Sequence, residues 1–154
     1  MTPFEAIAKF RVWGMAGVVG HLRDRLQYAR VARKLRKMAR RDAGREPVPG
    51  ITIVGDILGT CSNAHTCRDL AHALKAAGVP FQTFPTWPKP SIPEEDYRGI
   101  LTPESEFRPN RYSHVIEMFR SPLPRDLVKV RARVAFWEGE HGMLQVWPFL
   151  RGTD

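Results

Sequence analysis

Two carboxylates and an imidazole lie within four residues of one another in Trp137-Glu138-Gly139-Glu140-His141-Gly142. Side chains of these types can exchange protons with a substrate or bind sugar hydroxyls. The segment follows an expected strand, which is where α/β enzymes place functional groups. A solvated acidic turn is the alternative. We interpret Glu138, Glu140 and His141 as candidate catalytic residues.

A second candidate is the turn Gly55-Asp56-Ile57-Leu58-Gly59-Thr60-Cys61-Ser62-Asn63. It is expected to join a strand to a helix, and the unpaired N–H groups of a helix N-terminus can bind an anion. The spacing does not match a dinucleotide-binding fingerprint, so a plain strand-to-helix turn is the alternative. The residues that we expect to bind a ligand here are Gly55, Gly59, Asn63, His65 and Arg68.

Cys61, His65, Cys67 and His72 have the side-chain types of a metal site. Their spacing matches no zinc pattern, and on a helix Cys67 points away from the two histidines. We therefore expect no metal and no cofactor, with these residues serving packing and capping. No secretory signal precedes the cysteines, which predicts reduced thiols in a cytosolic protein.

Basic residues are concentrated in segment 1–46, which holds 12 of the 24 Lys and Arg residues and only four acids. Residues 47–154 have no net charge. We expect a helix with Phe4, Phe10 and Trp13 along one side, weakened or bent by Gly14, Gly17 and Gly20. The candidate membrane-binding residues are these three aromatic residues with Arg33, Lys34, Arg36 and Lys37.

An anionic membrane surface is the partner that this segment favours. Contact with nucleic-acid phosphates and simple packing on the rest of the chain are the alternatives. No apolar run approaches the ~20 residues that a membrane-spanning helix needs. We expect a cytoplasmic protein, peripheral at the inner face of the membrane.

The elements that must position these residues are those of an α/β domain. Ile51–Val54 is rich in β-branched residues and predicts a strand. A helix should run from Ser62 or Asn63 to Ala77, with Gly78 as its stop, and Phe81–Phe84 should be a second strand. Further strands are expected at Tyr112–Phe119 and Arg133–Trp137, and short helices at Pro122–Lys129 and Gly142–Leu150. On the expected strand Tyr112–Phe119, His114 and Glu117 should face opposite sides.

The 154 residues, 43% of them hydrophobic, suit one globular domain. We predict a single Rossmann-like α/β domain over 47–154 with a mostly parallel sheet, preceded by the basic helical segment 1–46. The proline-rich segment 85–110 should form a long loop, which is usually either functional or disordered.

Two stretches resemble the opening of bacterial GT-B glycosyltransferases. Gly50–Gly59 together with Arg68–Pro80 is similar to that family's apolar strand, glycine-rich turn and helix ending in Ala-Ala-Gly-Ile/Val-Pro. Val134–Glu138 is similar to its aromatic-Trp-Glu strand end. The chain has Ala64 and His65 where the family has a glycine and an acid.

The resemblance implies an acceptor-side domain for cell-envelope polysaccharide or glycan synthesis, with a glycan or lipid-linked acceptor and with 85–110 as the acceptor loop. In that family the donor binds mainly in a second domain, which these residues do not supply. We expect a fragment, a degenerate copy or a half that needs a donor-domain partner chain, and no sugar transfer by the chain alone. The alternative is a non-enzymatic module whose basic arm contacts nucleic acid. A small hydrolase built on Glu140 and His141 ranks below both, because no Gly-x-Ser-x-Gly nucleophile turn is present.

Overall fold

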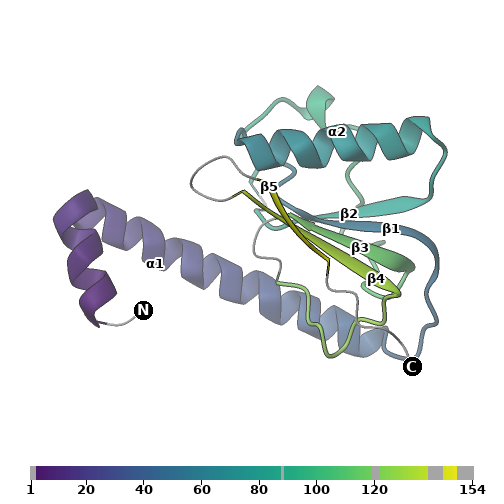
Figure 1. Ribbon diagram of the computed structural model, residues 1–154, viewed down its shortest axis with the longest axis horizontal. Helices are drawn as coiled ribbons and strands as arrows, with labels where there is room; N and C mark the ends of the chain where they lie inside the picture. Colours follow the sequence, from purple (N-terminus) through teal and green to yellow (C-terminus); the bar gives the residue numbers. More distant parts are fainter. Residues whose placement is uncertain (1–2, 88, 119–121, 139–143, 149–154) are drawn as a thin grey trace.

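The computed structural model describes residues 3–87, 89–118, 122–138 and 144–148. They form a five-stranded sheet in the order β2-β1-β3-β4-β5, between two helices (Figure 1). The strands are β1 (Val48–Gly55), β2 (Phe81–Pro85), β3 (Tyr112–Met118), β4 (Ala132–Glu138) and β5 (Leu144–Pro148). The first four are parallel, and β5 runs antiparallel to β4. The predicted α/β class with a mostly parallel sheet is confirmed.

Helix α2 (Ser62–Ala76) covers one face of the sheet. Its residues Cys67 and Ala71 pack with Ile53 of β1 and Met118 of β3 in one apolar cluster. Gly78 follows the helix with φ of 67°, a conformation that glycine adopts without steric cost, so the predicted stop is confirmed. Cys61 is the N-cap of α2 and makes no side-chain capping bond, so neither Ser62 nor Asn63 caps the helix.

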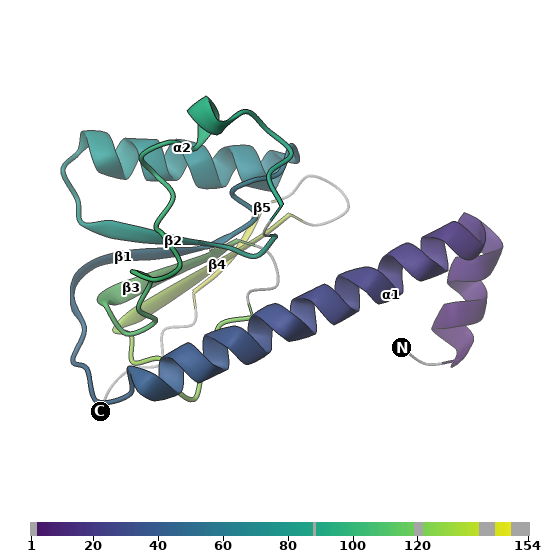
Figure 2. The same ribbon diagram turned by 180° about the vertical axis from the view of Figure 1, so that it is seen from behind.

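Helix α1 (Pro3–Arg41) covers the opposite face with its C-terminal part only. Leu35 and Ala39 are fully buried and pack with Val54, Phe84 and Val115 of β3 in a second apolar cluster. Figures 1 and 2 show the rest of α1 projecting beyond the sheet and changing direction in its purple, N-terminal part. The predicted basic helix is therefore also the second helical layer of the fold.

A buried polar hub holds the end of α1 against the sheet. The Asp42 carboxylate accepts the backbone N–H of Asn110 at 2.9 Å, and the Asn110 side chain donates to the carbonyl groups of Asp42 and Leu127. The backbone N–H of Lys129 donates to Asn110 Oδ1 at 2.7 Å. Asn110 is fully buried, so one side chain joins α1 to the segments that precede β3 and β4.

Segment 85–110 closes the free edge of β2. Thr83 and Thr102 exchange hydrogen bonds between their backbone N–H and hydroxyl groups, both at 2.9 Å. The buried Gln82 side chain donates to the Arg108 carbonyl group and accepts the Arg108 N–H. Phe107 is fully buried in the core on the α1 side. Between its Glu94–Asp96 3₁₀ helix and Asn110, the long loop is therefore bound to the edge strand by specific contacts.

Two predicted helices are wrong. Residues 122–130 form an irregular connection with a turn at 125–127, and Leu123 and Val128 are buried under α1. Pro124 disfavours the helical conformation for the residue before it, Leu123. The expected helix at Gly142–Leu150 is also wrong, because its residues 144–148 form strand β5. Leu144, Val146 and Pro148 occupy every second position of this strand, and proline is tolerated in it because β5 lies at the edge of the sheet. On β3, His114 is exposed and Glu117 buried, as predicted.

Candidate functional site

The carboxyl ends of β1 to β4 lie along one edge of the sheet, because the four strands are parallel. The connection after β1 leads through α2 to β2, and the connection after β2 returns across β1 to β3. The chain therefore reverses its direction of winding at β1. Open α/β sheets bind ligands at the carboxyl edge beside such a reversal, so this edge is the candidate site.

The turn after β1 is held together by Arg68. This side chain is buried, and its Nη1 donates to the carbonyl groups of Ile57 at 2.9 Å and Gly59 at 2.8 Å. Its Nη2 lies 3.1 Å from His65 Nδ1, which must be the acceptor since a guanidinium has only donors. Three of its five N–H donors are therefore used within the turn and by His65, and the ligand-binding role of Arg68 stays a prediction.

The two glycines of the turn are required by the protein's own packing. A Cβ on Gly55 would lie 2.6 Å from the Cys67 sulfur and 2.9 Å from Met118 Cβ, so glycine lets α2 approach the sheet. A Cβ on Gly59 would overlap the Asp56 carboxylate, which folds over it. The space beside these two glycines is thus filled by Cys67 of α2, by Met118 and by Asp56. Asn63 is partly exposed in the first turn of α2.

Asp56 is a site residue that sequence reasoning missed. Its Oδ2 accepts a weak bond from the Cys61 thiol at 3.6 Å. Its Oδ1 is buried and has no hydrogen-bond partner among the described residues. A buried carboxylate oxygen without a donor is costly. Its position directly after β1 was the available signal.

The cysteines form no ligand set with the histidines. Burial, followed by the charge of Asp56, raises the pKa of the Cys67 thiol to about 12. Cys67 therefore stays protonated near neutral pH, whereas a thiolate is what binds metal. Within the described ranges, no three His, Cys, Asp or Glu side chains gather as potential metal ligands.

The predicted catalytic residues follow β4. Glu138 is the last residue of that strand and pairs with Leu144 of β5. The segment that contains Glu140 and His141 therefore joins two antiparallel strands at the carboxyl edge. Glu140 and His141 themselves lie outside the described residues, as does the side chain of Glu138.

The projecting half of α1 exposes an apolar stripe. Met15, Val19, Leu22 and Leu26 are 65%, 56%, 44% and 61% exposed, and their spacing of four, three and four places them on one helical face. Farther along the same helix, Leu35 and Ala39 enter the core instead.

A groove of about 520 Å³ lies between this half of α1 and the segment that follows β2. Trp87 and Lys89 line one side, and the other is lined by Val19, Leu22, Arg23, Leu26, Gln27 and Arg30. Apolar and cationic side chains alternate here, and none of the lining residues is acidic. Because Trp87 follows the end of β2, the groove lies beside the candidate edge.

The predicted membrane-binding cations are all exposed. Lys34 pairs with Glu104 and Arg36 with Asp126, while Arg33 and Lys37 have no ionic partner among the described residues. Phe4, Phe10 and Trp13 lie on α1, and their side chains are outside what the structure describes. Neither described helix combines the length and apolar composition needed to cross a bilayer.

Comparison of the chain with known protein families, with curated proteins and with solved structures finds no match.

Proposed function

We propose that this chain is an acceptor-side, GT-B-like glycosyltransferase half that works at an anionic membrane surface. The observation that carries the proposal is the exposed stripe Met15, Val19, Leu22 and Leu26, beside cations, on the part of α1 that extends past the carboxyl edge of the sheet (Figures 1 and 2). Lipid bound by this stripe would lie on the same side as the candidate site. A lipid-linked acceptor would then reach the edge without leaving the membrane.

The residues of the stripe have the properties of an interfacial helix. Burying a large apolar side chain contributes about 1.5–3 kcal/mol when burial is complete. Each Lys or Arg close to an anionic surface adds about 1 kcal/mol. Arg23, Arg30 and Lys89 lie around the groove beside the stripe. Because residues 47–154 carry no net charge, α1 supplies the attraction.

Asp56 supports a glycan as the acceptor. Asp56 is partly exposed directly after β1, and a carboxylate accepts hydroxyl hydrogens, of which a sugar offers many. In the family that the sequence resembles, the donor sugar is bound by a second domain, so the proposed role of this chain is acceptor and membrane binding.

Co-sedimentation with vesicles tests the proposal. The full chain should pellet with phosphatidylcholine vesicles that contain phosphatidylglycerol and remain soluble with phosphatidylcholine alone. Leu22→Ser with Leu26→Ser should abolish pelleting, since both side chains belong to the stripe. Val48→Ser is the matched control, because Val48 is 53% exposed at the start of β1, away from the stripe. Equal pelleting of the stripe variant and the control would contradict the proposal.

The same preparation tests the nucleic-acid alternative. The chain would be a phosphate-binding module instead if it bound neither kind of vesicle but bound duplex DNA. The logarithm of its DNA affinity should then fall linearly with the logarithm of the salt concentration. Turnover of a nucleotide sugar by the purified chain would also overturn the proposal that this chain binds only the acceptor while a second domain binds the donor.

A further inference from the structure

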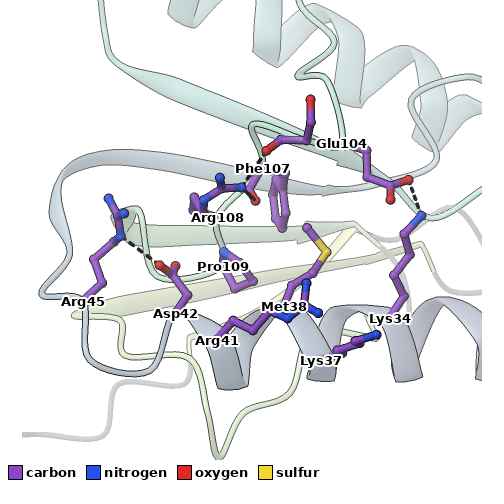
Figure 3. A pocket seen from close by; sticks show the side chains of 11 residues that line it. Lys34, Lys37, Met38, Arg41, Asp42, Arg45, Glu104, Phe107, Arg108 and Pro109 are labelled. Atoms are coloured by element: carbon purple, nitrogen blue, oxygen red, sulfur yellow. Dashed lines mark hydrogen bonds and ion pairs between the residues drawn. The ribbon is translucent and has the colours of Figure 1, made fainter.

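A second groove lies at the other end of the sheet, between the C-terminal turns of α1 and residues 104–109 (Figure 3). It has a volume of about 610 Å³, within the range of small-molecule sites. Five of its lining side chains are cationic and two are acidic, so an excess of three positive charges surrounds it. The cationic residues are Lys34, Lys37, Arg41, Arg45 and Arg108.

Ion pairs close the two ends of this groove and leave its centre basic. Lys34 pairs with Glu104 at one end, and Arg45 bonds the Asp42 carboxylate at 2.8 Å at the other. Figure 3 shows Lys37 and Arg41 on α1 between these pairs. Both are exposed, and neither has an ionic partner in the described part of the chain.

The opposite wall contributes a third cation, and the floor is apolar. Arg108 is fixed in place because its Nη1 donates to the carbonyl groups of Ser105 at 2.7 Å and Phe107 at 2.9 Å. Buried Phe107 and Pro109 lie below it, with Met38 beside them. Two cations on one wall therefore face a preorganised guanidinium across an apolar surface.

We propose that this groove binds an organic diphosphate, with the phosphate groups between Lys37, Arg41 and Arg108 and the organic part against Phe107, Pro109 and Met38. Arginine and lysine are the usual partners of phosphate, and three converging cations match an anion with several charges better than a single carboxylate. Glu104, 61% exposed at one end, disfavours contact with a flat anionic membrane. A phosphate that enters between the end pairs avoids that carboxylate. The site is at the amino edge of the sheet and is independent of the function proposed above.

Titration calorimetry of the full chain with inorganic pyrophosphate and with ADP tests this proposal. We expect saturable one-to-one binding, tighter for ADP because only ADP has an organic part to cover the floor. Lys37→Ala and Arg41→Ala should each weaken binding about tenfold, the usual effect of losing a hydrogen bond to a charged group. Arg40→Ala is the matched control, because Arg40 is exposed on the same helix and does not line the groove.

Vesicles containing phosphatidic acid distinguish a lipid phosphate from a soluble one. Binding to these vesicles, weakened by Lys37→Ala and Arg41→Ala but unchanged by Arg40→Ala, would assign the phosphate to a lipid headgroup and retain the site. Absence of binding to pyrophosphate and ADP, together with vesicle binding that Lys37→Ala and Arg41→Ala leave unchanged, would overturn the proposal. An equal loss in Arg40→Ala would also overturn it, because the attraction would then come from the whole helix.

Discussion

Replacing Asn110 with alanine should loosen α1 from the rest of the fold. The substitution removes three side-chain hydrogen bonds, to the carbonyl groups of Asp42 and Leu127 and from the N–H of Lys129. The bond from the Asn110 backbone N–H to Asp42 is kept, so the change isolates the side chain. Each buried partner left unsatisfied costs about 1–3 kcal/mol, which predicts a loss of about 3 kcal/mol or more.

Urea denaturation followed by far-UV circular dichroism measures that loss. The same change should lower Tm by roughly 10 °C for a chain of this size. Asn63→Ala is the control, because Asn63 is partly exposed and its substitution should stay within about 0.5 kcal/mol. A loss below about 1 kcal/mol for Asn110→Ala, with an unchanged denaturant slope, would refute the hub as the anchor of α1.

Four further outcomes follow from buried groups. Arg68→Ala should lower the free energy of unfolding by about 2 kcal/mol, because two carbonyl groups of the turn lose their donor. An unchanged urea midpoint would refute this role of Arg68 in the turn. In the native protein a thiol reagent should modify exposed Cys61 and spare buried Cys67, so two equivalents of reaction without denaturant would contradict the burial. Burial raises the pKa of Cys67 from 9.0 to about 12, so between these pH values the folded state keeps a proton that the unfolded state loses. The free energy of unfolding should therefore fall as the pH rises from 9.0 towards 12. Cys67→Ala should reduce this dependence of the free energy of unfolding on pH. Glu117→Gln should lower the free energy of unfolding by about 3–5 kcal/mol, because buried Arg133 would lose the carboxylate that lies 3.1 Å from it. Replacing both residues with apolar residues of similar size should lower it far less in the same urea denaturation experiment.

The parts of the fold that the sequence predicts are those governed by local preference. The β-branched run Ile51–Val54 lies within β1, and Gly78 follows α2 as its stop. Such signals act within a few residues, and distant contacts do not change them. The parallel order of the strands followed from one strand-helix-strand unit and its fixed handedness.

The errors come from decisions that distant contacts make. An apolar stripe along a helix does not show which turns meet a sheet, so the exposed Leu26 and the buried Leu35 have the same sequence signature. The buried role of Arg68 depends on where the turn after β1 places its carbonyl groups. The segment of β5 is stable as a strand because β4 offers it a free edge, which local propensity does not contain.

Because α1 is one continuous helix, it couples rotation to distance. A helix turns about 100° and rises about 1.5 Å per residue. One residue inserted between Leu26 and Val31 would leave the core contacts in place and swing the exposed stripe about a quarter turn around the axis. Seven inserted residues, close to two full turns, would restore its direction and move it about 10 Å farther out. The number of residues in this stretch therefore sets both the distance and the orientation of the sheet edge relative to whatever the stripe binds.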